Sequence, residues 1–145
     1  MTSDEYFVAE MVRAIGQSER IFSVSSRMIQ MYHPDRLDDA GDMYSLLGWA
    51  YQRGVGRDLT HYRRSSRVFS ACAGAAIYRR EVFEEIGYFD EMHFAYLEDI
   101  DVGYRARIAG YDNIYCPAAL VWHVGSGTSG SKYNSFKVKL AARNN

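Results

Sequence analysis

The chain has 145 residues, of which 48% are hydrophobic and 24% are charged, and its formal net charge is −1. These values are typical of one globular domain, here residues 1–145, and the near-neutral charge excludes nucleic-acid binding through overall charge. No apolar run reaches the ~18 residues that span a bilayer, the two distant cysteines form no zinc-binding pair, and the N-terminus lacks the basic stretch of a signal peptide, so we expect a cytoplasmic protein.

The first third of the chain predicts a helix followed by strands. Residues 3–16 place apolar side chains on one face and end at a glycine, which is typical of an amphipathic helix. Residues 21–29 alternate apolar and polar side chains and predict a strand. We expect a turn at residues 32–35, an irregular segment at residues 38–42 and a strand at residues 43–51.

The middle of the chain combines a polar loop with a strand of small residues. Residues 54–67 hold four arginines, which either contact a phosphate-bearing ligand or form a solvated surface. Residues 68–78 predict a buried strand in which Gly74 lets a backbone or a ligand approach closely. A short helix over residues 81–86 then ends at Gly87.

Residues 96–110 predict a further helix, which ends at a glycine suited to a left-handed cap. Asp101 and Arg105 are spaced for an ion pair one turn apart. The expected apolar stripe consists of Ile100, Tyr104 and Ile108. Three acids occupy the first turn, namely Glu98, Asp99 and Asp101. Because a helix N-terminus carries partial positive charge, their simplest role is to stabilise the helix.

The last third of the chain predicts two short strands and a helix. The strands cover residues 113–116, where Pro117 stops the first, and residues 120–124. A flexible Gly/Ser-rich loop follows at residues 125–131, and residues 134–143 form a final helix. Strands that alternate with helices predict an α/β layered fold.

An ordered set of motifs runs through the chain. It comprises residues 70–80 (SACAGAAIYRR), 86–91 (IGYFDE), 95–105 (AYLEDIDVGYR), 110–111 (GY), 117–118 (PA) and 122–123 (WH), with weaker matches at 24–29, 34–35, 37–41, 48 and 54–56. This set resembles the C-terminal half of the family 2 glycosyltransferases, most closely the rhamnosyltransferase-type enzymes of bacterial surface polysaccharide assembly. The order of the motifs from residue 74 to residue 101 is specific, whereas any one tripeptide is a weak signal.

The resemblance implies a GT-A fold, an α/β fold with a mixed sheet and flanking helices that transfers sugars from nucleoside diphosphates. It also implies inverting transfer of the sugar to a hydroxyl acceptor, which is a glycan or a lipid-linked glycan. In the family, the second acid of the pair that begins this helix is the catalytic base, and that position is Asp99. The neighbouring residues Glu98, Tyr96 and Asp101 would bind the acceptor.

The same resemblance implies a donor side. Gly74, Arg79 and Gly125 would contact the donor, and His123 would be a ligand of Mg²⁺ or Mn²⁺ beside the donor diphosphate. Such an ion stabilises the charge of the nucleoside diphosphate as it leaves. The alternative for His123 is an ordinary histidine at a strand end.

One departure from the family is expected to matter. Family members carry nucleotide-binding strands and an Asp-x-Asp metal motif in a first half that we do not find here. The letters Asp99-Ile100-Asp101 repeat the motif, but they fall in the helix that carries the base. We therefore expect an incomplete GT-A domain, its N-terminal nucleotide-binding half absent, that is inactive on its own.

Three alternatives compete with this interpretation. A glycoside hydrolase needs two carboxylates that face each other across the sugar, whereas Glu98 and Asp99 diverge by about 100° on a helix. A non-catalytic carbohydrate- or partner-binding module would self-associate, as a homodimer, through an uncovered sheet edge or face. The chain has no acid after Asp112, and its basic tail favours peripheral contact with the anionic inner face of the membrane.

Overall fold

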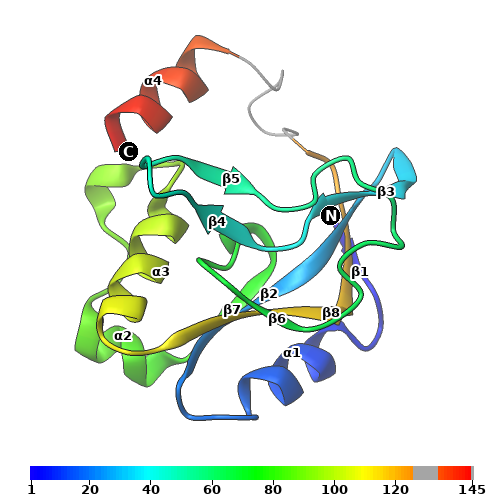
Figure 1. Cartoon of the computed structure of the whole chain (residues 1–145), viewed down its shortest axis with the longest axis horizontal. Coiled ribbons are helices and arrows are strands. Elements are labelled where there is room, and N and C mark those ends of the chain that lie inside the picture. Colours follow the sequence, from blue (N-terminus) through cyan, green and yellow to red (C-terminus); the bar gives the residue numbers. More distant parts are fainter. Residues whose placement is uncertain (126–133, 145) are drawn as a thin grey trace.

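The computed structural model describes residues 1–125 and 134–144. Its centre is a six-stranded mixed sheet in which two long strands, β2 (Ile21–Gln30) and β8 (Asp112–His123), run parallel and side by side (Figure 1). Four short strands pair antiparallel with these two. They are β1 (Thr2–Ser3) and β6 (Ser66–Val68) on β8, and β3 (His33–Asp39) and β7 (Ala76–Tyr78) on β2.

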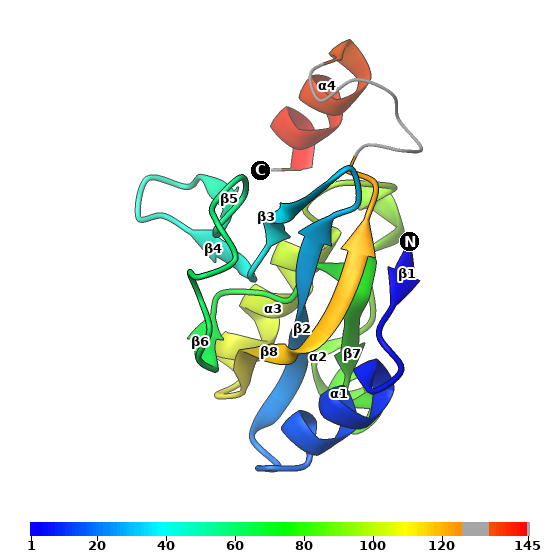
Figure 2. The same ribbon diagram turned by 90° about the vertical axis from the view of Figure 1, so that its right-hand side faces the viewer.

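Helices cover both faces of the sheet (Figure 2). α1 (Phe7–Ile15) packs on one face, and α2 (Arg80–Ile86) and α3 (Glu98–Ile108) pack on the other. Because β2 lies between the two layers, its first nine residues are all buried, including three serines and an arginine. The mixed α/β architecture expected from the sequence is therefore confirmed.

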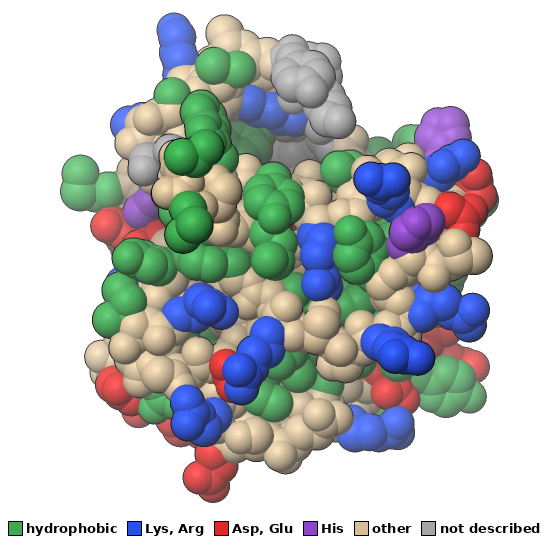
Figure 3. Space-filling model, viewed as in Figure 1, with side chains coloured by type: hydrophobic (Ala, Val, Ile, Leu, Met, Phe, Trp, Pro, Cys, Tyr) green, Lys and Arg blue, Asp and Glu red, His purple; other side chains and the backbone are tan. Residues whose placement is uncertain are grey.

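The two strands β4 (Asp42–Tyr44) and β5 (Ala50–Gln52) form a hairpin separate from the main sheet. The prediction of one strand over residues 43–51 is wrong because the chain reverses in the middle of this segment. At the reversal, Gly48 takes a φ of +81°, which suits glycine. We name this element the β4–β5 hairpin; apolar side chains gather over it (Figure 3).

Two further segments differ from prediction. Of the turn expected at residues 32–35, only Tyr32 lies in a turn, and β3 begins at His33, so that Pro34 lies in an exposed stretch of the strand. The strand expected over residues 68–78 is interrupted by a 3-10 turn (Ala73–Ala75), so that only its last three residues form β7.

The strand β8 continues through Pro117, which was expected to stop it. Its register with β2 jumps from the pair Ser26–Cys116 to the pair Arg27–Leu120. Pro117 therefore lies in a bulge, where its missing N–H leaves no gap in the hydrogen-bond ladder.

The helix α3 buries a different face from the one expected. Tyr104 is 53% exposed and Ile108 is 70% exposed, whereas the buried residues are Ile100, Val102, Gly103 and Ala106. The stripe prediction is wrong because the helix packs closely enough to need small residues: a Cβ on Gly103 would lie 2.6 Å from the Ser70 side chain. The predicted ion pair is confirmed, with Arg105 Nη2 2.7 Å from Asp101 Oδ2.

The ends of the chain agree more closely with prediction. The first helix begins at Phe7, later than expected, because Thr2 and Ser3 pair with β8. The final helix is α4 (Ser135–Asn144), and most of the loop expected before it lies outside the described residues. Within the described ranges, no helix is both long enough and apolar enough to cross a membrane.

Candidate functional site

An open pocket of about 1030 Å³ lies between α3, α4, the β4–β5 hairpin and the end of β8. The sequence-predicted site residues that line it are Tyr96, Glu98, Asp99, Gly74, His123 and Gly125. Gly74 and Gly125 lie about fifty positions apart in the chain. The structure therefore brings these predicted acceptor, donor and metal residues to one pocket, all except Asp101 and Arg79.

Asp99 is a half-buried carboxylate at the first turn of α3. Its Oδ2 accepts a hydrogen bond from the Ala73 N–H at 3.2 Å, and its Oδ1 accepts one from the Ile100 N–H at 2.9 Å. The Ser70 hydroxyl donates a hydrogen bond to the Asp99 carbonyl and so links the first turn of α3 to the segment that contains Ser70. Burial raises the pKa of the Asp99 carboxyl, the Ala73 N–H opposes the rise, and the nearby Glu98 adds to it.

Glu98 and Tyr96 lie in the segment that leads into α3. Among the described residues, Glu98 Oε2 is buried without a hydrogen-bond partner. Tyr96 and Leu97 have φ angles of +67° and +68°, which are unfavourable for residues with a side chain. The Asn144 side chain of α4 donates to the Tyr96 carbonyl at 2.8 Å and helps to hold this backbone. Strained backbone next to a buried acid is typical of a functional site.

His123 forms the opposite side of the site with a residue that the sequence analysis missed. Its Nδ1 lies 2.7 Å from Asp38 Oδ2, at the end of β3. A carboxylate partner on one ring nitrogen orients the ring and leaves the other nitrogen to bind a metal ion. A set of histidine and carboxylate suits Mn²⁺ better than Mg²⁺, which prefers oxygen ligands. The pair therefore fits the ion that the resemblance implies.

The two glycines of the predicted donor side differ in their surroundings. A Cβ on Gly125 would lie 3.2 Å from Asp38 Oδ1, so the glycine lets the backbone pass the histidine–aspartate pair. A Cβ on Gly74 would make only ordinary contacts, at 3.6 Å from Met28 and 3.7 Å from Cys72. Packing within the described residues thus does not require Gly74, and its role toward a donor stays a prediction.

Two predicted site residues lie apart from the pocket. The Arg79 guanidinium donates to three main-chain carbonyls around the end of α1, those of Ile15, Ser18 and Ile21. Asp101 is held by Arg105, which also donates to the carbonyls of residues 86–88. Both side chains have structural partners, and neither is among the residues that line the pocket.

The structure adds a second group of acids in a segment that the sequence predicted to be irregular. Asp39 and Asp42 lie buried near Cys72, and burial raises the pKa of Asp39 to about 7 and that of Asp42 well above its ordinary value. A signal is present in the sequence, since three acids occur within residues 38–42. Such a run of acids is, however, equally typical of a polar surface loop.

Comparison with known proteins identifies the family. The model of the family described as "Glycosyltransferase like family 2" matches residues 4–144. The chain is 34% identical over 96 residues to N-acetylglucosaminyl-diphospho-decaprenol L-rhamnosyltransferase of Mycobacterium tuberculosis, in the strains CDC 1551 / Oshkosh and ATCC 25618 / H37Rv, which covers 62% of this chain and 31% of the relative. It is 29% identical over 135 residues to the uncharacterized protein y4gI of Sinorhizobium fredii, which covers 86% of this chain and 14% of the relative.

The chain thus spans about a third or less of the length of these relatives. The family match extends over nearly all of its residues and includes the pocket, with Asp99 on one side and His123 on the other. The chain belongs to glycosyltransferase family 2.

Proposed function

We propose that the pocket carries out inverting transfer of a sugar from a nucleoside diphosphate to a hydroxyl acceptor, with Asp99 as the base. The observation that supports this most is the position of Asp99. It is a half-buried carboxylate, held by two backbone N–H groups, in the same pocket as the His123–Asp38 pair. One side of the pocket thus suits a proton acceptor and the other suits a diphosphate.

The chemistry follows from the residue types. Asp99 removes the proton of the acceptor hydroxyl while the acceptor oxygen bonds to the anomeric carbon, and the bond from that carbon to the diphosphate oxygen breaks. A raised pKa makes Asp99 a stronger base, which favours proton transfer near neutral pH. The unpartnered oxygen of Glu98 supplies an acceptor for a second sugar hydroxyl.

The metal side rests on His123 and Asp38. A divalent ion there supplies charge stabilisation for the leaving diphosphate. Asp38 fixes the His123 ring through the 2.7 Å contact, and Gly125 keeps the space beside the pair open. We propose that catalysis needs a further Asp-x-Asp motif, because Asp101 of the one such sequence in this chain is engaged by Arg105. The chain alone then binds ligands without turnover, and measured transfer by the purified chain would contradict this.

The acceptor class is suggested by the similar mycobacterial enzyme, whose name specifies a diphospho-decaprenol substrate. We propose that this chain serves bacterial surface polysaccharide synthesis and acts on a lipid-linked glycan at the cytoplasmic face of the membrane. Of the basic tail, Arg143 is used in the fold, where it donates to the carbonyls of Met92 and His93.

The first test is a thermal-shift titration of the chain with UDP, dTDP and GDP, each with Mn²⁺ and with EDTA. A ligand at 100 times its Kd stabilises by about 2.7 kcal/mol, which corresponds to roughly 5–10 °C in Tm. We expect such a shift with one nucleotide, in Mn²⁺ only. His123→Ala should abolish it, and His61→Ala, on the exposed loop outside the pocket, should preserve it. No shift with any of the three nucleotides would contradict the proposal.

A second candidate function is self-association without catalysis. It is favoured by the β4–β5 hairpin, whose tip exposes Leu46 and Leu47 almost completely and Trp49 by 68%. Three large apolar side chains in four residues are unusual on a monomer surface and are typical of a binding surface. This surface is separate from Asp99, so the two functions are compatible.

A further inference from the structure

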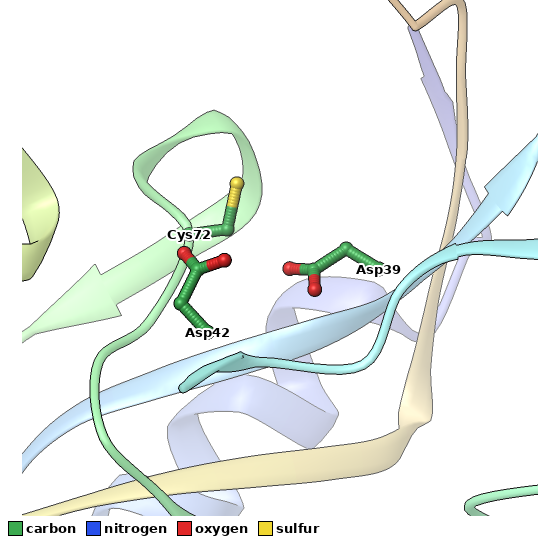
Figure 4. Close-up of side chains that lie close together, drawn as sticks. All are labelled: Asp39, Asp42 and Cys72. Atoms are coloured by element: carbon green, nitrogen blue, oxygen red, sulfur yellow. The ribbon is translucent and has the colours of Figure 1, made fainter. Parts of the chain in front are cut away.

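A second set of side chains of the metal-ligating type lies at the wall of the pocket and has no part in the transfer chemistry. It consists of Asp39 at the end of β3, Asp42 at the start of β4 and Cys72 just before the 3-10 turn, with one ligand atom from each within 4.8 Å of the others (Figure 4). Gly41, which lies between the two aspartates, has a φ of +97°, a backbone conformation that suits glycine.

Asp39 shows that this set is more than a cluster of acids. Its side chain is 0% exposed, and its Oδ1 accepts a hydrogen bond from the Gly41 N–H at 3.0 Å. Its Oδ2 is buried and has no partner among the described residues, and in Figure 4 the carboxylate points toward Asp42 and Cys72. Leaving a buried carboxylate oxygen without a partner is costly, so a ligand at this point is expected to relieve the cost.

Acids surround Asp42, and the nearby Arg53 guanidinium donates to the Ala40 carbonyl and not to a carboxylate of this set. None of the ion pairs formed among the described residues includes Asp39, Asp42 or Asp99. The charged groups that act on Asp42 are all acids, namely Asp39, Asp99 and Glu98. Buried acids that lack a basic partner are expected to bind a cation or to retain protons.

We propose that Asp39, Asp42 and Cys72 bind one divalent transition-metal ion of the zinc type, at a site separate from His123. A thiolate among the ligands selects zinc-like ions over Mg²⁺ and Ca²⁺, which prefer oxygen. Ligand atoms around a tetrahedral zinc ion lie about 3.5 Å apart, so the three side chains need to close by about 1 Å. The metal–sulfur bond forms as the Cys72 thiol releases its proton to solvent.

This ion would have a positional consequence. It links the β4–β5 hairpin to Cys72, and the next residue, Ala73, is the one whose N–H holds Asp99. Three protein ligands also leave a fourth position on the ion, and both Asp42 and Cys72 line the pocket. A metal ion at this site would therefore hold in place the part of the pocket wall that bonds to Asp99.

The experiment is titration of the chelator-treated chain with Co²⁺, followed by absorption spectroscopy. A cobalt–thiolate bond gives a charge-transfer band in the near ultraviolet, which carboxylate and histidine ligands do not give. We expect this band at one equivalent of Co²⁺, and we expect Zn²⁺, but not Mg²⁺, to remove it by competition. Cys72→Ser should eliminate the band, and Asp39→Asn should weaken Co²⁺ binding by more than about tenfold.

Two control variants distinguish this site from cobalt binding elsewhere on the chain. Cys116→Ser changes the other cysteine of the chain, which is buried under α1, and should retain the band. His123→Ala should also retain it, so that failure of the nucleotide test and failure of this one are distinguishable. Far-ultraviolet circular dichroism confirms that each variant is folded, and Asp42→Asn replaces a ligand variant, Cys72→Ser or Asp39→Asn, that is not. Absence of the band in the native chain, or its persistence in Cys72→Ser, would overturn the proposal.

Discussion

Asp99 and Asp101 stand two residues apart on one helix, yet their surroundings differ completely. Asp99 is half-buried in the pocket, and no ion pair formed among the described residues includes it, whereas Asp101 accepts two hydrogen bonds from Arg105, at 3.0 and 2.7 Å. Residues placed for function are often unfavourable for stability. We therefore expect neutralisation of Asp99 and neutralisation of Asp101 to change the stability of the chain in different directions.

Neutralising each acid tests this contrast. We expect Asp99→Asn to keep or raise Tm, because it removes a desolvated charge that forms no ion pair within the described part of the chain. Asp101→Asn should lower the free energy of unfolding by about 1–3 kcal/mol, because the Arg105 guanidinium loses its carboxylate partner. Thermal unfolding at pH 8 measures both. A lower Tm for Asp99→Asn than for Asp101→Asn would indicate that Asp99 is a structural residue.

Asp39 gives a pH dependence of known sign. Its pKa rises from 3.8 to about 7 on folding because it is buried, so between these values the folded chain holds a proton that the unfolded chain has lost. The stability that this retained proton contributes is complete below about pH 4 and is lost as the pH rises toward 7. In EDTA, we expect Tm to fall over this window and Asp39→Asn to flatten the fall.

The matched control is Asp58→Asn. Asp58 is exposed, and its pKa is lowered by hydrogen bonds from Thr60, so this variant should leave the fall between pH 4 and pH 7 unchanged. An equal fall of Tm with pH in the native chain and in Asp39→Asn would show that Asp39 does not retain its proton.

At the scale of elements, α3 is positioned by the absence of a side chain. Gly103 lies against Ser70, whose hydroxyl also bonds to the Asp99 carbonyl, so the same contact places the helix and its acid. Asn113 of β8 adds to this packing, since its amide donates to the carbonyls of Gly103 and Phe69. Close helix packing and the position of Asp99 are therefore coupled.

Substitutions on the two faces of α3 test this arrangement. Gly103→Ala puts a methyl group 2.6 Å from Ser70 and should cost about 1–3 kcal/mol of stability. Ile108→Ala, on the face that the sequence wrongly assigned to the core, should change stability by less than about 0.5 kcal/mol. Urea unfolding of both variants measures these changes in stability. A larger loss of stability for Ile108→Ala than for Gly103→Ala would indicate that the predicted stripe of α3 is the buried face.

The β4–β5 hairpin makes a separate prediction. Because Leu46 and Leu47 are exposed, the double substitution of both residues to serine should leave Tm almost unchanged. If copies of the chain associate through this tip, light scattering will show a dimer for the native chain and a monomer for the variant. A native monomer, or a dimer in both, would exclude association through the hairpin.

The sequence predicted best those elements that depend on local pattern. The strand at residues 21–29, the helix after Tyr78 and the Asp101–Arg105 ion pair needed only alternation, caps and one-turn spacing. It failed where partners distant in the chain decide the outcome. Ser70 selects the buried face of α3, and pairing with β2 carries β8 past Pro117.

The residues of the candidate site show the same contrast between local signals and contacts with distant parts of the chain. The family motifs located Asp99, Glu98 and His123, which the pocket brings together. They did not reveal Asp38, which lies 85 positions from His123 and meets it only through the sheet. The Asp39–Asp42–Cys72 group likewise depends on the left-handed backbone at Gly41 and on the 3-10 turn, which no spacing rule in the sequence indicates.

At the scale of the whole molecule, the chain is a sheet with helices on both faces and a large pocket at one end, where α4 and the β4–β5 hairpin meet the ends of β3 and β8 (Figures 1 and 2). The opposite end carries α1 and α2, whose contacts are structural, as Arg79 shows. The residues of the proposed site thus lie at one end of the sheet, and the packing contacts of α1 and α2 lie at the other end. A ligand of the proposed class should affect one end of the molecule alone.

The measurement that tests this most directly is amide chemical-shift mapping of the ¹⁵N-labelled chain during titration with UDP, dTDP or GDP in the presence of Mg²⁺. Because Mg²⁺ does not favour thiolate, the map reports on the donor side without occupying the proposed zinc-type site. The account predicts shifts at the amides of Ala73, Leu97 and His123, and none at Val8 of α1 or Val82 of α2. Shifts centred on α1 or α2, or no shifts with any nucleotide, would contradict the assignment of this pocket to sugar transfer.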